Sequence, residues 1–248
     1  SWIGSEVVIN PSFGWGERDE APGPGFSILG LPRDGTLAEQ IAVPVEQVAP
    51  KPAHLTWEQA AALPLAGLTA YRALVTRARL RAGERVLITG IGGGVAALGL
   101  MLARALGARV WVTSSRPDAL AQARAQGAEA GFDYTQPVWI EAAKAVGGFD
   151  VILDSAGGET LPSLIEVAAP GARLVSYGAT LGNPGSFALR KVFWRQLSLL
   201  GTTMGSPRDW AGLLACVTSQ RLQPPVGAVY PLEHVSEAFA LMEQGAQQ

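Results

Sequence analysis

The sequence contains few of the side chains that bind transition metals or form covalent cross-links. Its 248 residues include one cysteine, Cys216, and two histidines, His54 and His234, which are far apart in the chain. A single cysteine cannot form an intrachain disulfide, and a structural zinc site needs about four thiolate or imidazole ligands. The sequence therefore excludes a disulfide-stabilised scaffold and a cysteine-rich zinc lobe, and it predicts no resident metal.

Long apolar runs and an excess of either charge are also missing. No run approaches the roughly 20 residues that cross a bilayer, and the formal net charge is only −2. A nearly neutral chain offers no extended basic surface for nucleic acid. We therefore expect a cytoplasmic α/β protein that acts on a small molecule and binds neither membranes nor nucleic acid.

A glycine cluster lies between an apolar run and a helical pattern. The run Val86–Ile88 leads into Gly90, Gly92 and Gly93, and apolar residues at helical spacing follow. A helix N-terminus exposes unpaired N–H groups and a partial positive charge, so it can hold phosphate, and glycines let the backbone approach a pyrophosphate. With a second strand expected at 109–113, the cluster predicts a dinucleotide site. A plain tight connection between a strand and a helix is the alternative.

The end of that second strand indicates which dinucleotide binds. NAD-binding units usually place an acidic residue there for the ribose hydroxyls. Here the strand is followed by Ser114, Ser115 and Arg116, and a guanidinium suits a phosphate through its fork of donors. The sequence therefore favours NADPH over NADH. The alternative is that the two serines cap the helix expected from Pro117, and both interpretations can hold together.

Strands and helices alternate through the middle of the chain, which predicts a parallel sheet covered on both faces. Before it, a capping box at Thr56 and Gln59 predicts a helix that ends at Pro64, followed by a second helix from about Thr69. The expected strands are at 7–9, 37–43, 45–49, 85–89, 109–113, 150–154, 172–177 and 197–202. The expected helices include 94–106, 117–126, 137–146, 159–168, 210–218 and 235–243.

Five segments occur together in a specific order: Asp34–Glu39, Ala60–Tyr71, Thr89–Ala96, Asp150–Gly158 and Pro170–Ala179. Through these segments the chain resembles the medium-chain dehydrogenase/reductase superfamily, in its zinc-free quinone oxidoreductase and enoyl reductase-like branch. Each segment alone is weakly specific, but together they span most of the chain.

The resemblance implies two domains of an α/β protein. A doubly wound parallel (Rossmann) sheet that binds NADP would occupy residues 66–203. A GroES-like, β-rich catalytic domain would include residues 1–65, and residues 204–248 would return to it. The resemblance also implies that an amino-terminal part of the catalytic domain lies outside this sequence. Any proton donor carried there is unknown, so no catalytic residue is assigned.

Two departures from the zinc-dependent members affect the expected chemistry. Those members carry a cysteine-rich lobe where this chain has Phe13–Ile28, and they place a metal-binding cysteine where it has Leu65. Leucine cannot coordinate a metal. We therefore expect neither structural nor catalytic zinc.

The resemblance also implies a coenzyme contact for each matching residue. The pyrophosphate would lie against the glycine turn, the 2′-phosphate beside Ser114–Arg116 and Tyr134, and the nicotinamide end against backbone groups of residues 177–179. Asp154 follows a strand without an obvious partner and is interpreted as structural. The alternative role for Thr69 is that of a helix N-cap. The alternative for Tyr134 is that of an ordinary aromatic residue at the end of a strand. The implied coenzyme contacts are Thr69, Gly90, Gly92, Gly93, Val95, Ala96, Ser114, Ser115, Arg116, Tyr134, Ser155, Ala156, Tyr177, Gly178, Ala179, Gly201 and Thr202.

Without zinc to stabilise an alkoxide, simple alcohol oxidation becomes difficult, whereas hydride transfer to a quinone or to an α,β-unsaturated carbonyl needs less help. The sequence therefore predicts an NADPH-dependent quinone or enone reductase. Three alternatives are a relative of the zinc-type alcohol dehydrogenases, a non-catalytic NADPH-binding protein and an S-adenosylmethionine methyltransferase. The last also has a glycine turn after its first strand, but the order of the later segments speaks against it. In relatives the strand that matches Ser198–Thr202 pairs with its twin, so the resemblance also implies a homodimer.

Overall fold

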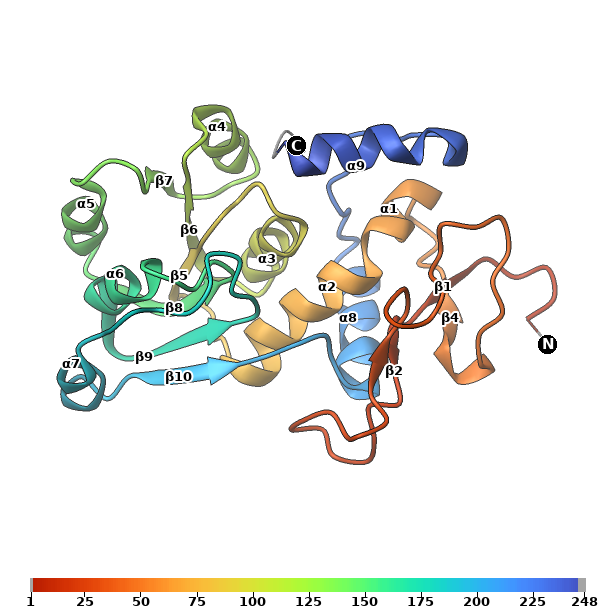
Figure 1. Ribbon diagram of the computed structural model, residues 1–248, viewed down its shortest axis with the longest axis horizontal. Coiled ribbons are helices and arrows are strands. Elements are labelled where there is room, and N and C mark those ends of the chain that lie inside the picture. The colour runs from red at the N-terminus through yellow and green to blue at the C-terminus, as the bar shows by residue number, and fades with distance from the viewer. Residues whose placement is uncertain (1, 245–248) are drawn as a thin grey trace. The chain divides into compact units, whose positions relative to one another are not determined.

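The computed structural model describes residues 2–244, and its chain falls into two compact units. One unit contains the residues up to Leu68 together with those from Met204 onward, and the other contains Thr69–Thr203. Figure 1 shows their elements in chain order. The second unit carries most of the sites predicted from the sequence.

A six-stranded parallel sheet forms the centre of the second unit, and its strand order is β10-β9-β8-β5-β6-β7. Within this sheet, the chain first forms β5, continues to β6 and β7, and then returns to the other side of β5 to form β8, β9 and β10. This order confirms the doubly wound sheet, and its direction reverses between β5 and β8. The strands are β5 (Arg85–Ile88), β6 (Arg109–Ser114), β7 (Ala130–Asp133), β8 (Phe149–Asp154), β9 (Ala168–Ser176) and β10 (Ser198–Gly201).

Helices cover both faces of this sheet (Figure 1). A side chain at Gly99 of α3 would meet Ile88 and Leu153, so α3 packs closely on one face. Leu87 and Ile152 alternate with these residues and belong to the apolar core on the opposite face. The helices of this unit are α3 (Gly94–Ala105), α4 (Pro117–Ala125), α5 (Trp139–Ala145), α6 (Thr160–Val167) and α7 (Leu189–Trp194).

Aromatic side chains fill the core beneath α5 and α6. Phe149, at the start of β8, is fully buried, and its ring meets the rings of Trp111 and Phe132 edge-on at centroid distances of 5.6 and 6.3 Å. Trp139 of α5 is buried in the same cluster. Edge-to-face contacts stabilise aromatic pairs beyond the area that they bury. This packing holds the strands rigidly, so that their carboxyl ends keep fixed positions.

The first unit combines two short antiparallel strand pairs with helices. Its elements are β1 (Val7–Ile9) paired with β4 (Val48–Pro50), β2 (Ser12–Phe13) paired with β3 (Ser27–Ile28), the 3₁₀ turns η1 (Val45–Gln47) and η3 (Leu232–His234), and the helices α1 (Trp57–Ala62), α8 (Pro207–Ser219) and α9 (Val235–Glu243). Helix α2 (Pro64–Tyr71) continues directly into a π-helical turn, η2 (Arg72–Arg77).

The predicted start of α1 is confirmed, but its predicted end is only partly right. The amide of Gln59 donates to the Thr56 hydroxyl at 3.3 Å, and the Thr56 amide donates to the Gln59 side chain at 3.1 Å. Pro64 ends α1 as expected but also begins α2, because proline lacks only an N–H that a first helical turn does not use. The helix expected from Thr69 therefore starts earlier.

Two further strand predictions differ from the structure. Residues 37–43 form no strand, and of the strand expected at 45–49 the first three residues form the turn η1, so that β4 begins only at Val48. The short strand β7 is not among the strands expected from periodicity, because its sequence Ala-Gly-Phe-Asp is too short to show an alternating pattern. Its position comes from pairing with β6.

Candidate coenzyme site

The glycine turn leads from β5 into α3 as the sequence predicts. Gly90 has a φ of +64°, which favours glycine, and the amide of Gly93 closes the turn on the Gly90 carbonyl at 3.0 Å. Gly93 is the N-cap of the 12-residue helix α3, and no side chain caps it. A Cβ at Gly92 would meet nothing within 4 Å. The first N–H groups of α3 thus have no side-chain cap, and the space beside Gly92 is open, with Val95 half-buried and Ala96 buried in the first turn. This arrangement fits an anionic diphosphate.

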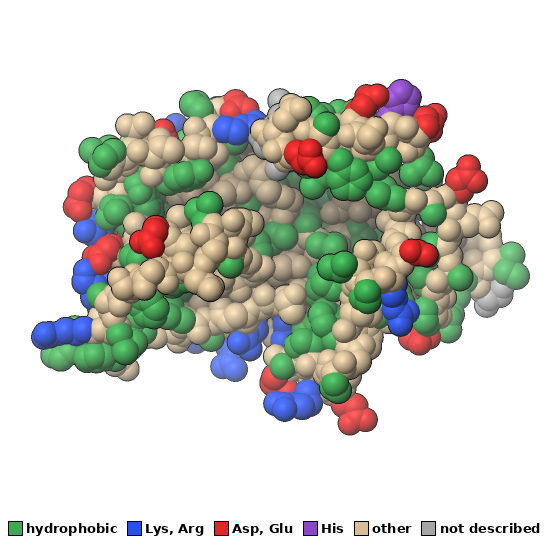
Figure 2. Space-filling view, in the orientation of Figure 1, with side chains coloured by type: hydrophobic (Ala, Val, Ile, Leu, Met, Phe, Trp, Pro, Cys, Tyr) green, Lys and Arg blue, Asp and Glu red, His purple; other side chains and the backbone are tan. Residues whose placement is uncertain are grey.

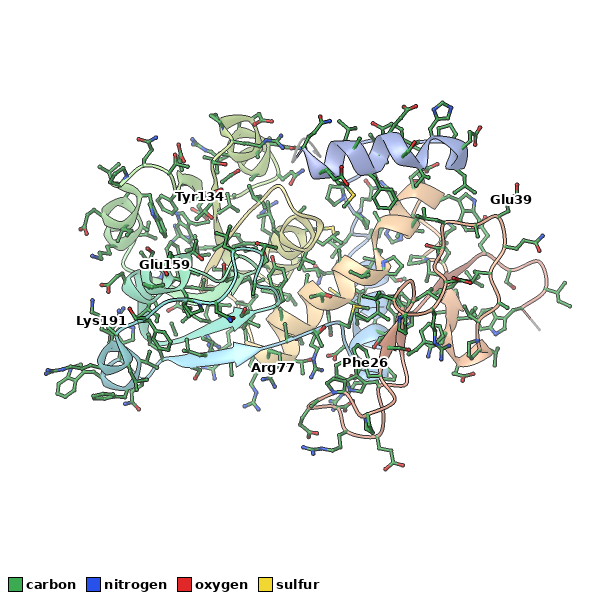
Figure 3. All side chains as sticks on the ribbon, viewed as in Figure 1. Phe26, Glu39, Arg77, Tyr134, Glu159 and Lys191 are labelled. Atoms are coloured by element: carbon green, nitrogen blue, oxygen red, sulfur yellow. The ribbon has the colours of Figure 1, made fainter. Side chains whose placement is uncertain are left out.

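Four predicted residues come together where β6 and β7 end. The strands pair so that Ser114 lies beside Asp133, which places Ser115 next to Tyr134. The Tyr134 hydroxyl donates to the Ser115 hydroxyl at 3.3 Å, and Tyr134 is 45% exposed. Figure 3 labels Tyr134 at this end of the sheet. We call the group formed by Ser114, Ser115, Arg116 and Tyr134 the β6–β7 polar cluster. Ser114 is buried, whereas Ser115, Arg116 and Tyr134 present hydroxyl and guanidinium groups at the surface.

The serines do not cap α4, so that alternative is wrong. The N-cap of α4 is Arg116, which makes no side-chain capping bond, and Pro117 occupies the first turn. The Ser114 hydroxyl instead accepts a hydrogen bond from the Arg116 amide at 3.1 Å. Ser114 thereby fixes the backbone that carries Arg116.

An acidic residue that sequence reasoning missed engages the arginine of this cluster. Arg116 Nη2 lies 2.5 Å from Asp118 Oδ2, and Arg116 Nε donates to Asp118 Oδ1 at 3.2 Å. This hydrogen bonding raises the pKa of Arg116 and lowers the pKa of Asp118. The only signal in the sequence was a carboxylate two residues after the arginine. Asp118 therefore competes with any anion for the Arg116 guanidinium.

Asp154 has hydrogen-bond donors around it that the sequence did not reveal, and they give a physical reason for its structural role. Its side chain is buried, with 4% exposure. The Thr89 hydroxyl donates to it at 2.7 Å, and the amides of Ala156 and Gly157 donate at 3.2 and 3.0 Å. This carboxylate therefore shapes the chain directly after β8, including the predicted contacts Ser155 and Ala156, which are half-buried.

The segment 177–182 runs alongside the segment 155–158. The Tyr177 amide donates to the Asp154 carbonyl at 2.9 Å, and further backbone bonds join 180 to 155, 181 to 156 and 158 to 182. A Cβ at Gly178 would come within 3.0 Å of the Ser155 carbonyl oxygen. A cavity of about 320 Å³ opens beside this segment, at the ends of β8, β9 and β10, and Gly178, Ala179 and Gly201 help to line it.

Thr202 and Thr69 complete the set of predicted contacts. The Thr202 amide donates to the Ser176 carbonyl at 2.9 Å, but its buried hydroxyl has no hydrogen-bond partner among the described residues. The Gly201 carbonyl accepts from Arg77, which Figure 3 labels, at 2.9 Å. Thr69 is buried in the middle of α2, so its alternative role as an N-cap is wrong.

Metal-ligating side chains are not gathered anywhere in residues 2–244: no group of three or more His, Cys, Asp or Glu could hold a metal ion. His54 lies 2.9 Å from the Leu222 carbonyl, and His234 lies 2.7 Å from Glu237. Leu65 is 48% exposed. In the same part of the chain, no helix is both long and apolar enough to span a bilayer.

Comparison with known proteins identifies the family. The sequence model of the family described as zinc-binding dehydrogenase matches residues 94–219, about half of the chain. A solved NAD-dependent alcohol dehydrogenase is 37% identical with a TM-score of 0.90, covering 98% of this chain and 73% of that one. The chain belongs to the medium-chain dehydrogenase/reductase superfamily. This confirms the resemblance to that superfamily.

Two of the similar proteins are quinone oxidoreductases, and they indicate the branch. Mouse quinone oxidoreductase is 31% identical over 82% of this chain and 64% of its own length. The quinone oxidoreductase of Thermus thermophilus, whose structure was solved with NADPH, is 30% identical with a TM-score of 0.77, covering 97% of this chain and 88% of that one. The chain thus falls in the quinone oxidoreductase and enoyl reductase-like branch of the superfamily.

The comparisons also include proteins named for zinc. A zinc-type alcohol dehydrogenase-like protein of Leptosphaeria maculans is 31% identical over 90% of this chain and 66% of its own length. The chain spans about two thirds of the curated relatives that it first matches, with 66% and 64% for two of them. The proteins compared are named as oxidoreductases, but their names differ in the substrate that they reduce or oxidise.

The phenol of Tyr177 gives this site a measurable pH dependence. Burial raises the pKa of Tyr177 to about 12, the charge of Asp154 adds to the increase, and a hydrogen bond with Ser155 opposes it. A pKa that is higher in the folded state contributes stability below the unfolded value of 10.0, and this stability is lost as the pH rises from there toward about 12.

We therefore expect the free energy of unfolding to fall more steeply in the wild type than in Tyr177→Phe, by about 1.4 kcal/mol per pH unit across this window. Urea unfolding at several pH values measures it. Parallel slopes for the two proteins would contradict a half-buried phenol that stays neutral in the folded state.

Proposed function

We propose that the protein reduces quinones or α,β-unsaturated carbonyls with NADPH and without zinc. The family supplies the general activity of an oxidoreductase, and neighbours solved with NADP or NADPH support a dinucleotide coenzyme. The observation that carries the proposal for NADPH is the β6–β7 polar cluster. It has hydroxyl and guanidinium donors at the strand end where NAD-binding units carry a carboxylate.

Each part of the described site has groups that suit one part of the coenzyme. The uncapped N-terminus of α3 and the open space at Gly92 suit the diphosphate. Ser115, Arg116 and Tyr134 suit a 2′-phosphate, because phosphate oxygens accept several hydrogen bonds at once. Half-buried Ser155 and Ala156 suit the adenosine ribose.

The nicotinamide would lie at the other end of the site. Tyr177, Gly178 and Ala179 line this end with backbone groups, and the unpartnered Thr202 hydroxyl beside Gly201 suits the carboxamide. Thr69 of α2 would face the ring. When bound, the reduced nicotinamide supplies the hydride. The protein's part is to orient the acceptor against the ring and to exclude water, both of which lower the barrier.

The donor set of the chain supports reduction without zinc. Zinc catalysis of alcohol oxidation needs about three protein ligands that hold the ion and leave one open position. This chain carries Leu65 where zinc-dependent members carry a cysteine, and its single cysteine and two histidines do not lie within a cluster of ligands in the described part. Quinones and enones accept a hydride without an alkoxide to stabilise. They are therefore the acceptor classes that fit.

The purified full-length protein should oxidise NADPH, followed by its ultraviolet absorbance, with at least one member of a panel of quinones and enones, and EDTA should not slow it. Metal analysis of the same sample should find no stoichiometric zinc. Alcohol oxidation that requires zinc would favour the zinc-type alternative. NADPH binding without turnover on any acceptor would favour a non-catalytic role.

The Arg116–Asp118 pair should set the degree of preference for NADPH. In Asp118→Asn the guanidinium is released and a like charge beside the 2′-phosphate is removed, so affinity for NADPH should rise about threefold or more while affinity for NADH stays the same. Arg116→Ala should lower affinity for NADPH alone. Calorimetric titration with each coenzyme measures both effects.

The exposed ion pair of Arg109 with Glu129 provides a matched control. Arg109 forms a comparable exposed pair with Glu129 at the opposite end of β6, so Glu129→Gln should leave the preference unchanged. An equal shift in Asp118→Asn and Glu129→Gln would show a general charge effect and contradict the specific role of Asp118.

The free edge of the sheet supports a homodimer. Strand β10 pairs with β9 on one side only, as far as the described residues show, and Leu199 on it is 41% exposed. Phe193 and Trp194 of the neighbouring helix α7 are 57% and 74% exposed, and Figure 2 shows hydrophobic side chains gathered over α7 beside basic ones. An open edge of this kind invites pairing with another strand. We propose that a second copy covers it.

Light scattering of the full-length protein should give twice the mass of one chain. Leu199→Lys should shift the mass toward the monomer, because a charge on an edge strand opposes pairing. Val229→Lys, at a residue that is 64% exposed outside any strand or helix, should remain dimeric. A wild-type protein with the mass of a monomer refutes the dimer.

A further inference from the structure

A buried carboxylate lies at the point where the direction of the sheet reverses. Asp154 ends β8 with 4% exposure, and Thr89 directly follows β5 with 6% exposure. Because β5 and β8 are neighbours in the sheet, these two residues face each other across the switch point. The proposed coenzyme contacts do not include either side chain.

The carboxylate receives donors from both sides of this point. On the β5 side, the Thr89 hydroxyl donates to Oδ1 at 2.7 Å. On the β8 side, the amide of Ala156 donates to Oδ1 at 3.2 Å and that of Gly157 to Oδ2 at 3.0 Å. An ionised carboxylate only accepts hydrogen bonds, so three donors suit it and an amide in its place would oppose at least one of them. Asp154 therefore connects the end of β5 to the turn after β8.

Each of the two connected segments leads to a different part of the proposed site. Thr89 directly precedes Gly90, the first glycine of the turn proposed for the diphosphate. Residues 155–158 carry backbone hydrogen bonds to 180–182, next to the groups proposed for the nicotinamide. Gly157 also packs closely there, since a Cβ on it would come within 2.8 Å of the Gly182 carbonyl oxygen.

We propose that Asp154 is a positioning residue for hydride transfer. Through Thr89 on one side and Gly157 on the other, it fixes the separation between the diphosphate turn and the nicotinamide segment. This inference rests on the proposed function. Small displacements of a reacting group lower the rate strongly even when binding is maintained. The carboxylate thus controls the rate of transfer more than the affinity for the coenzyme.

The experiment compares Thr89→Val, Thr89→Ser and Asp154→Asn in the full-length protein. Valine keeps the shape of threonine without its hydroxyl, whereas serine keeps the hydroxyl. For each variant we would measure the Kd of NADPH, kcat with the best acceptor of the panel, and the isotope effect with NADPH deuterated at the transferred position. Thermal unfolding would identify any variant that fails to fold, and Thr89→Val carries the test if Asp154→Asn does not fold.

The expected result is a separation of rate from affinity. Thr89→Val should lower kcat by about 10- to 100-fold and raise the isotope effect, with a change in Kd below about threefold. Thr89→Ser should keep kcat within about threefold of the wild type. Thr89→Val with an unchanged kcat, or with losses of affinity and rate in equal proportion, overturns the role of Asp154 while the proposed function stands. A wild-type protein that binds no dinucleotide or reduces no acceptor overturns both.

Discussion

The proposed coenzyme site depends on the reversal of chain direction between β5 and β8. On one side of this boundary the chain continues through β6 and β7, and on the other through β8, β9 and β10. In open α/β sheets, ligands bind outside the carboxyl ends of the strands at such a point of reversal. The turn that begins at Gly90 and the buried carboxylate of Asp154 lie at this boundary.

The core beneath the sheet explains why these strand ends are well placed. The middle of each central strand is apolar and fully buried, at Val86–Ile88 of β5 and Val151–Leu153 of β8, as expected for parallel strands buried on both faces. Phe149, Trp111 and Phe132 lock three strands together through edge-to-face contacts. The polar residues begin where the strands end: Thr89, Ser114 and Asp154 are all buried at that edge. Apolar packing thus sets the positions, and hydrogen bonds at the edge determine the local shape.

The sequence predicted the parts of the fold that local chemistry determines. The glycine turn, the capping box at Thr56 and the buried strands each have a pattern within a few residues, and the structure contains them. It did not predict what depends on distant partners. Strand β7 exists because β6 offers it an edge, and residues 37–43, which were expected as a strand, pair with no other strand of the described chain. In the site, the partners of Asp154 lie across the sheet from it, and the pairing of Asp118 with Arg116 depends on rotamers that no spacing reveals.

The close approach of Gly178 to the Ser155 carbonyl restricts how this site can be redesigned. Any larger residue at Gly178 would push two hydrogen-bonded segments apart, and Gly157 is confined in the same way by the Gly182 carbonyl. Libraries for directed evolution of acceptor scope would therefore lose most of their members if they randomised these glycines. The exposed neighbours Ala179 and Asn183 border the same cavity without this restriction. They are the positions at which new side chains can alter the cavity while the backbone stays intact.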